Sequence, residues 1–247
     1  MEDMQGRAKS AHIDTGNDLE TGNDLETATD LETATIHGSF LTPQIFSARV
    51  GEIRRECFIQ DGRFSNDSIC NLRYDSFDPT ALHLLFGKTG AETGAIRLSL
   101  YSAQAGLPFV HFYPDFKQEL SIGDSEISRF ILHPTQRGAL AALILIEGVV
   151  RTAANLTSNR IFIDVVTGAT GLKPRSYTKH LGFVSTGLKG FDEDYDSASE
   201  LMVLDGLHNI QSLAEKLRAD VLGVHGRHHE ERLKGQGRWS SSKDHAI

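Results

Sequence analysis

The sequence predicts a single domain of the mixed α/β (α+β) class, with a central, largely antiparallel sheet flanked by helices. Segments with the apolar alternation of strands are interspersed with segments whose apolar residues recur at helical spacing. Two predicted strands, residues 83–87 and 95–101, are separated by a short turn, as in a hairpin, so the sheet is not wholly parallel. Residues 126–155 combine a further strand with a long helix that follows it directly. Together these features favour a mixed sheet covered by helices.

The composition indicates a soluble domain with a substantial core. The chain has 247 residues, of which 39% are hydrophobic, and a mean hydropathy of −0.26. No apolar run reaches the ~20 residues of a membrane span, because Glu147 interrupts the longest one. The N-terminus lacks the basic and apolar pattern of a secretion signal, so we expect a cytoplasmic protein. Cys57 and Cys70 form neither a disulfide framework nor a metal-ligand cluster, and we expect no metal site.

Most of the net charge of −8 lies at the N-terminus. Residues 1–36 hold nine acidic residues against Arg7 and Lys9, a balance of −7 that leaves −1 for the rest of the chain. The body is therefore near neutral and has no nucleic-acid footprint. Residues 15–35 repeat a hexad, Thr-x-x-Asp-Leu-Glu, whose single Leu fits neither a helical face nor a strand. We expect residues 1–38 to form a disordered acidic leader.

The first half of the body, which begins near Phe40, combines a helix with the hairpin. Apolar residues at helical spacing, with arginines between them, predict a helix over residues 43–60. A link rich in Gly, Asn and Asp separates this helix from the two hairpin strands. Residues 103–124 contain Gly106, Pro108 and Pro114, which favour irregular structure.

The second half continues the alternation of strands and helices. Periodicity predicts these elements in order: strand 126–133, helix 139–155, strand 160–166, helix 172–181, strands 183–185 and 200–204, and an amphipathic helix over 207–221. After Val224 the chain is polar and rich in His, so residues 225–247 are expected to be a flexible tail and residues 39–224 the domain.

The junction of the central strand and helix is the most informative stretch chemically. Glu126 opens the strand, and Pro134 removes a ladder donor at its end. Thr135 can cap the helix that follows. The unpaired amides of that helix start, beside Arg137, can hold an anion such as a phosphate.

This junction resembles the pyrophosphate loop of the GNAT N-acyltransferase superfamily. The family pattern Arg/Gln-x-x-Gly-x-Gly/Ala is matched at Arg137 and Ala142, whereas Leu140 takes the place of the middle glycine. The resemblance implies a GNAT-like domain in which Arg137, Gly138 and Ala139 bind the phosphates of the acyl donor.

A later segment matches the same superfamily only in part. Leu-Gly-Phe at residues 181–183 resembles the family ending that follows a proton-donating Tyr. In this chain the corresponding residue is Thr178, and Tyr177 lies one residue away. Tyr177 is therefore not assigned as the general acid.

A second resemblance, over residues 54–131, is to the acyl-homoserine-lactone (autoinducer) synthases and the related N-acyl amino acid synthases. Five elements follow the family order: Arg54 with Phe58, Phe64 in place of a Trp, Asp75 and Asp78 before His83, Gly94-x-x-Arg97-Leu98, and Glu126-x-x-Arg129-Phe130. The replaced Trp and the basic segment 173–180 look more like the N-acyl amino acid synthases.

The resemblance implies an N-acyltransferase that moves a long-chain acyl group from a thioester to the amine of an amino acid. The donor would be acyl carrier protein or coenzyme A, with no permanently bound cofactor. Two alternatives stay open, an acyl-homoserine-lactone synthase that uses S-adenosylmethionine and a non-catalytic acyl-binding or regulatory module. The basic residues Lys173, Arg175 and Lys179 would bind an acidic acyl carrier protein.

Roles for the site residues follow from the same resemblance. Glu126 would take a proton from the amine as general base, and amides near residues 130–132 would bind the thioester oxygen as it becomes negative. The amine pocket would be shaped by Arg54, Asp75, Asp78, Arg97 and Arg129. The ring of Phe109, with Leu143, would line a tunnel for the acyl chain.

The residues alone leave three local alternatives open. Asp75 and Asp78 either cap a turn before Pro79, or hold the amine or pair with Arg54. Arg97 lies in an apolar strand and needs a carboxylate partner, for which Glu126 and Asp78 are the candidates. Glu126 and Arg129 are three apart and face opposite sides of a regular strand, unless a bulge brings them together.

Overall fold

The computed structural model describes residues 35–39, 47–60, 75–88, 90–134, 139–167, 174–192 and 197–240. Seven strands form one sheet in the order β1-β2-β3-β4-β5-β7-β6. Their bounds are Thr35–Ser39 (β1), Leu82–Lys88 (β2), Ala91–Leu100 (β3), Asp124–Leu132 (β4), Arg160–Val166 (β5), Val184–Asp192 (β6) and Ser197–Asp205 (β7). Every neighbouring pair is antiparallel except β4 and β5. The predicted mixed, largely antiparallel sheet is thereby confirmed.

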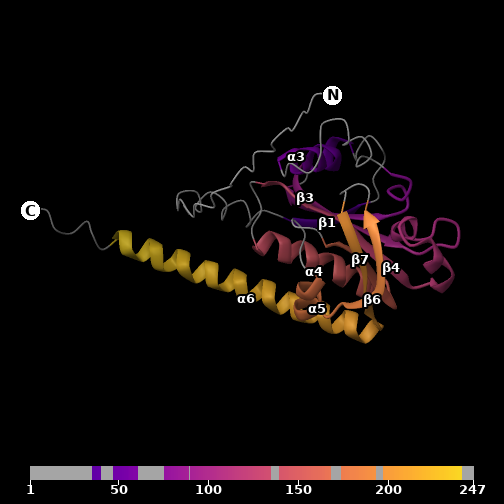
Figure 1. Cartoon of the computed structure of the whole chain (residues 1–247). Helices are drawn as coiled ribbons and strands as arrows, with labels where there is room; N and C mark the ends of the chain where they lie inside the picture. The colour runs from indigo at the N-terminus through magenta and orange to yellow at the C-terminus, as the bar shows by residue number, and fades with distance from the viewer. Residues whose placement is uncertain are drawn as a thin grey trace, which may run out of the picture.

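Helices lie on both faces of this sheet (Figure 1). The helical segments are η1 (Ser47–Gly51), α3 (Glu52–Gln60), η3 (Pro108–His111), η4 (Pro114–Glu119), α4 (Ala139–Asn155), α5 (Pro174–Leu181) and α6 (Leu207–Ser240). Figure 1 shows α4 and α6 below the sheet and α3 above it. We call the two sides of the sheet the α4 face and the α3 face.

The main core fills the α4 face. Leu84, Ile96, Leu145 and Leu213 belong to one buried cluster that joins the sheet to α4 and α6. The apolar side of α4 drives this packing, and Glu147, which interrupts its sequence, pairs with Arg151 one turn later at 2.8 Å. The predicted helix at residues 139–155 therefore serves as the main support of the sheet.

The α3 face carries a smaller, aromatic core. Phe109 and Tyr113 pack there against Phe162 of β5, whose neighbours Ile161 and Ile163 belong to the main core on the other side. Alternate strand residues point to opposite faces, which places η3 and η4 on the α3 face. This face receives both α3 and the irregular chain that the sequence analysis predicted at residues 103–124.

Helix α3 is tied to the end of β4. The thiol of Cys57 donates to the carbonyl of Leu132 at 3.0 Å, and Glu56 meets His133 at 2.8 Å. Cys57 is buried, as expected of an ordinary core thiol. These contacts place the N-terminal half of α3, including Arg54, over the middle of the sheet.

Strands β4 and β5 are paired over a short length only. The parallel register joins Asp124, Ser125 and Glu126 to Arg160, Ile161 and Phe162, and it stops there. Beyond Glu126 the two strands continue without pairing to each other. A gap in the ladder therefore opens at Glu126, the residue that the sequence analysis assigned as general base.

The limits of several elements differ from the predictions. Strand β1 begins at Thr35, inside the predicted leader of residues 1–38, and pairs with β2. Helix α6 continues to Ser240, through most of the predicted flexible tail. At ~1.5 Å per residue its 34 residues span about 51 Å, and Figure 1 shows its C-terminal part projecting from the body. None of the helices in the described part of the chain is long and apolar enough to cross a membrane.

Candidate active site

Glu126 is buried on the α3 face at the point where β4 and β5 separate. Its side chain is 3% exposed, and its Oε2 accepts a hydrogen bond from the backbone N–H of Phe109 at 2.7 Å. Burial raises the pKa of Glu126 to about 7, against the opposing effects of Arg97 and the Phe109 amide. A carboxyl group with a pKa near neutrality can both accept and release a proton under physiological conditions.

A β-bulge follows Glu126 in the same strand. Ser128 pairs with Arg97 and Ile131 with Ala95, so Arg129 and Phe130 of β4 lie opposite a single residue of β3. Arg129 takes the left-handed conformation, with a φ of 54°. The bulge was one of the two alternatives left open for Glu126 and Arg129, and it is the one found.

Arg97 is the centre of a buried charge network on this face. Its side chain is 2% exposed, and its Nη1 lies 2.6 Å from Asp75 Oδ2 and 2.9 Å from Asp78 Oδ1. Its Nε donates to Ser128 Oγ at 3.1 Å, and Arg129 Nη2 lies 3.6 Å from Asp75 Oδ2. Asp78 is therefore the carboxylate partner that Arg97 required, and Asp75 is a second one.

The surrounding charges also set the protonation of this network. Burial alone would lower the pKa of Arg97, but Asp75, Asp78 and Glu126 raise it above its ordinary value. Burial alone would raise the pKa of Asp75, but Arg97 and Arg129 hold it below its ordinary value. Both shifts favour the charged forms of Arg97 and Asp75.

Arg54 and His83 complete the network around Asp78. Arg54 Nη1 lies 3.8 Å from Asp78 Oδ2, and His83 Nε2 lies 3.4 Å from Asp78 Oδ1. Burial lowers the pKa of Arg54 to about 9 and that of His83 to about 4, and the Asp78 carboxylate opposes both shifts. His83 is therefore neutral at physiological pH, and Arg54 is charged.

Asp75 and Asp78 cap the turn before Pro79, and Asp78 also pairs with Arg54, while a role in holding the amine stays a prediction. Asp75 Oδ1 accepts the amides of Phe77 and Asp78 at 2.9 and 3.1 Å, while Asp78 Oδ2 accepts the amide of Asp75 at 2.7 Å. The same carboxylates pair with Arg97 and Arg54. Every carboxylate oxygen of the pair thus already has a partner within the protein, which makes it a support for the site.

A second polar cluster on the same face was not found from the sequence. The hydroxyl of Tyr113 donates to Asp164 Oδ1 at 2.9 Å and lies 2.9 Å from Ser199 Oγ. Asp164 sits among apolar residues in β5, and a lone carboxylate in such a segment was the available signal. Opposite Glu126 in β3 is Ser99, whose buried Oγ has no hydrogen-bond partner within the described chain.

Phe109 contributes to the site through its backbone amide. Its ring is 1% exposed and packs against Phe116 and Phe162, with ring centroids 5.7 and 5.0 Å apart. The ring therefore packs within the aromatic core, and its role in lining an acyl tunnel stays a prediction. The backbone amide of Phe109 is the group that reaches Glu126.

Several predicted residues are placed only in part. Phe64, Arg137, Gly138 and Lys173 lie outside the described residues, so the anion loop and the aromatic position stay predictions. Ala139 is the first residue of α4, and Arg175 lies in α5. The side chain of Lys179 is exposed near the end of α5.

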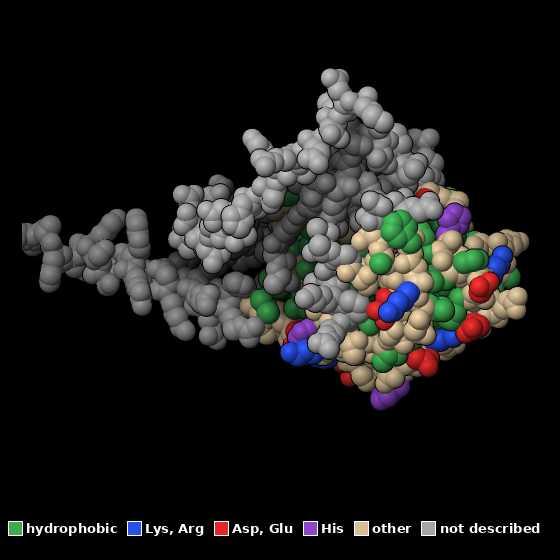
Figure 2. All heavy atoms as spheres, in the orientation of Figure 1, with side chains coloured by type: hydrophobic (Ala, Val, Ile, Leu, Met, Phe, Trp, Pro, Cys, Tyr) green, Lys and Arg blue, Asp and Glu red, His purple; other side chains and the backbone are tan. Residues whose placement is uncertain are grey.

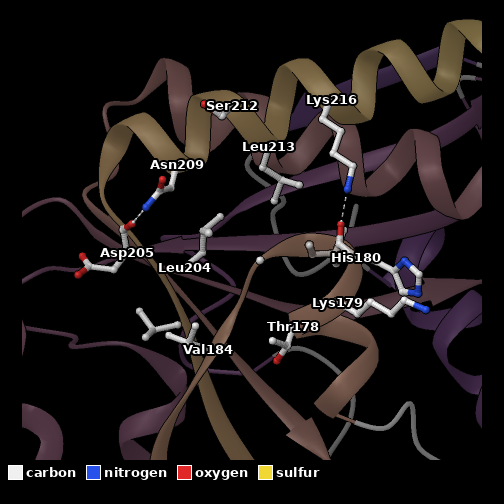
Figure 3. Close-up of a pocket in the computed structure, with 13 residues that line it drawn as sticks. Thr178, Lys179, His180, Val184, Leu204, Asp205, Asn209, Ser212, Leu213 and Lys216 are labelled. Atoms are coloured by element: carbon white, nitrogen blue, oxygen red, sulfur yellow. Dashed lines mark hydrogen bonds between the residues drawn. The ribbon is translucent and has the colours of Figure 1, made fainter.

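A hollow of about 490 Å³ lies elsewhere, between α5, the ends of β6 and β7, and the first turns of α6. Figure 3 shows Lys216 donating to the carbonyl of His180, at 2.9 Å, and Asn209 donating to the carbonyl of Asp205, at 2.7 Å. Among the predicted site residues that the structure describes, only Lys179 lies on its wall. On the face drawn in Figure 2, the described acidic and basic side chains are interspersed with apolar ones.

Comparison with known proteins supports the fold assignment. No protein-family model matches the chain, and no curated protein matches it in sequence. The structure is similar to FeeM, an N-acyl amino acid synthase from uncultured soil microbes, with a TM-score of 0.53 and 17% identity over 73% of this chain and 94% of that one.

Two coenzyme A-dependent acyl-homoserine-lactone synthases give comparable matches. BjaI has a TM-score of 0.53 and 18% identity over 74% of this chain and 89% of its own, and MesI has 0.52 and 18% over 76% and 95%. At such identities the likeness establishes the fold, which is the predicted GNAT-like fold of the N-acyl amino acid synthases and autoinducer synthases.

Proposed function

We propose that the protein is an N-acyltransferase that transfers a long-chain acyl group from a thioester to the amine of an amino acid. The observation that carries the proposal is Glu126, a buried carboxyl group with a pKa of about 7 at the gap between β4 and β5. An acyl-accepting amine is protonated near neutral pH and must lose a proton before it can attack. Glu126 has the acidity that this step needs.

The reaction is a substitution at the thioester carbonyl. Glu126 takes one proton from the ammonium group, and the neutral amine attacks the carbonyl carbon to form a tetrahedral intermediate. The C–N bond is complete when the C–S bond breaks, and the thiolate leaves with the electrons of that bond. A second proton of the original ammonium ends on the sulfur, and Glu126 releases the first to solvent. The products are an N-acyl amino acid, the free thiol and a proton.

The bulge in β4 lies where the negatively charged oxygen of the intermediate would bind in this proposal. Arg129 and Phe130 lie opposite a single residue of β3, so the regular ladder between β3 and β4 is interrupted at this segment. Amides near residues 130–132 would hold the carbonyl oxygen as it becomes negative. The nearby guanidinium of Arg129 adds positive charge to this side of the gap.

The arginine and aspartate network gives the pocket its shape in this proposal. Arg54, Asp75, Asp78 and Arg97 hold the turn at residues 75–80 against β3, beside Ser128 of β4. Because their charges are already paired, these groups would contact the acceptor little and fix the walls around it.

The donor is proposed to be acyl carrier protein or coenzyme A. Arg137, Gly138 and Ala139 would hold its phosphates at the start of α4, where helix amides favour an anion. Lys173, Arg175 and Lys179 would contact an acidic carrier protein. The similar synthase BjaI is coenzyme A-dependent, which supports testing both donors.

The proposal is tested by mass spectrometry of lipid extracts from cells that overproduce the chain. We expect a new N-acyl amino acid, which disappears when Glu126→Gln replaces the wild-type protein. An acyl-homoserine lactone would instead identify a lactone synthase, as the fold of BjaI and MesI would allow. Absence of any new acylated amine from a well-folded wild-type protein would refute the acyltransferase assignment.

A further inference from the structure

Asp164 carries a carboxylate oxygen for which the described residues supply no hydrogen-bond donor. Its Oδ1 accepts a hydrogen bond from Tyr113, whereas its Oδ2 is buried and has no hydrogen-bond partner within the described chain. Buried polar atoms in native proteins are nearly always satisfied, because an unpaired one costs free energy. Asp164 Oδ2 is one of several such atoms in the described chain, and it can accept a hydrogen bond from a bound ligand.

Several elements hold Asp164 in place. The hydroxyl of Tyr113 bridges Asp164 of β5 and Ser199 of β7. Gly190 of β6 makes room for the Tyr113 ring, since a Cβ at that glycine would come within 2.9 Å of ring atoms. Three strands and the loop before β4 thus orient one carboxylate, as expected of a positioned group.

Asp164 faces the gap that contains Glu126. Phe162 is the register partner of Glu126, and Asp164 lies two residues further along β5, so all three point to the α3 face. At ~3.3 Å per residue, Asp164 lies about 7 Å further along the strands than Glu126, where β4 and β5 are no longer paired. Burial raises the pKa of both carboxyl groups, and the Asp164 charge raises that of Glu126 further.

We propose that Asp164 binds the protonated amine of the acceptor, with its Oδ2 accepting one N–H of the ammonium group. This inference rests on the proposed acyl transfer and assigns the acceptor site to a residue outside the family motif. Asp75 and Asp78 are already occupied by Arg97, Arg54 and backbone amides, whereas Asp164 offers an unused acceptor. An ammonium group between Asp164 and Glu126 would pair with both carboxylates.

The two carboxylates then have different tasks. Glu126 removes the proton that activates the amine, while Asp164 keeps its hydrogen bond to the remaining N–H and directs the nitrogen lone pair at the thioester carbon. The acceptor class is therefore a primary amine that is cationic before reaction. A nucleophile that binds in its neutral form lacks the ionic attraction to Asp164 and therefore depends on it less.

The decisive experiment compares wild type with Asp164→Asn, using decanoyl-coenzyme A and decanoyl-acyl carrier protein as donors. The acceptors are the common amino acid that the wild type acylates fastest, and hydroxylamine, which is uncharged at pH 8. A hydrogen bond to a charged group contributes ~1.5–3 kcal/mol, so we expect the KM for the amino acid to rise about 10- to 100-fold. The KM for the donor and the rate with hydroxylamine should stay within about twofold.

Two further variants complete the experiment, the first as a control and the second as an independent test. Asp205→Asn makes the same chemical change at an exposed site on β7 and should leave both KM values unchanged. Tyr113→Phe removes the bond to Oδ1 and should raise the KM for the amino acid by about threefold or more. Asp164→Asn should unfold at no lower temperature than wild type, because it keeps an oxygen for the Tyr113 hydroxyl and removes a charge that burial disfavours.

The outcomes separate the inference from the function on which it rests. An active wild type whose Asp164→Asn variant keeps the amino acid KM, or loses activity equally with hydroxylamine, overturns the role of Asp164. If that variant unfolds early, Tyr113→Phe decides, and an unchanged amino acid KM again overturns the role. A wild type that acylates neither acceptor overturns the proposed function itself.

Discussion

Replacement of Asp78 by Asn should destabilise the protein far more than an ordinary surface substitution. The Asp78 side chain is 0% exposed and faces the guanidinium groups of Arg97, at 2.9 Å, and Arg54, at 3.8 Å. Each arginine side chain is only 2% exposed. The variant keeps the size of the side chain but removes a negative charge from beside two buried cations. Asp75 is then the carboxylate that still pairs with Arg97.

The expected magnitude follows from this burial. Removal of one partner from a buried ion pair costs ~3–5 kcal/mol, because the remaining charge stays away from water. For a domain of this size each kcal/mol lowers the melting temperature by about 2–4 °C, so the loss should be about 6–20 °C. Asp75→Asn is the matched control, since its side chain is 21% exposed and solvent can compensate part of the loss.

Urea unfolding followed by circular dichroism measures both variants. We expect Asp78→Asn to lower the free energy of unfolding clearly more than Asp75→Asn, with the same dependence on urea concentration. If Asp78→Asn unfolds within about 1 kcal/mol of wild type, the network does not hold the turn to the sheet. The account of Asp75 and Asp78 as supports of the site would then be wrong.

Three further predictions concern the site and its supports. Glu126→Gln should lower turnover by ~10²-fold. The kcat/KM of wild type should rise with pH up to about 7, because Glu126 loses its proton over that range. A flat pH profile would argue against Glu126 as the general base. Burial raises the pKa of Glu126 from 4.5 to about 7, so the folded state binds the proton more tightly than the unfolded state. The stability of wild type relative to Glu126→Gln should therefore fall as the pH rises from 4.5 to about 7. An equal pH dependence of unfolding in the two proteins would contradict the burial of Glu126. Gly94→Ala should cost ~1–3 kcal/mol in thermal unfolding, since its Cβ would lie 2.7 Å from Leu132 Cδ2 in the core; an unchanged midpoint would mean that this contact relaxes freely.

The elements with strong periodicity could be predicted from the sequence. Strand β5 (Arg160–Val166) and helix α4 (Ala139–Asn155) have the predicted limits, because apolar residues dominate both segments at the spacing of their element. Strand β1 was missed because its five residues, Thr-Ile-His-Gly-Ser, carry little apolar alternation and follow the acidic repeats. It is an edge strand, held by backbone pairing to β2, a long-range contact that local patterns do not encode.

The candidate site likewise contains residues that the sequence predicts and residues that it does not. The motif residues Arg54, Asp75, Asp78 and Arg97 do meet, because the hairpin and α3 bring them to one face. The bulge at Arg129 was left as one of two alternatives, since only the pairing with β3 reveals the extra residue. Asp164 escaped notice because its importance depends on Tyr113 and Ser199, which are 51 and 35 residues away along the chain.

The bulge also sets which face of the sheet each residue of β4 points to. Ile127 and Leu132 both pack against the α4-face core, although five positions apart they would face opposite sides of an uninterrupted strand. The additional residue at the bulge corrects the phase, so removing Arg129 would leave the inside-outside alternation of β4 intact. Such a deletion should yield a chain that still folds, with a regular β3–β4 ladder in place of the bulge that the proposed mechanism uses.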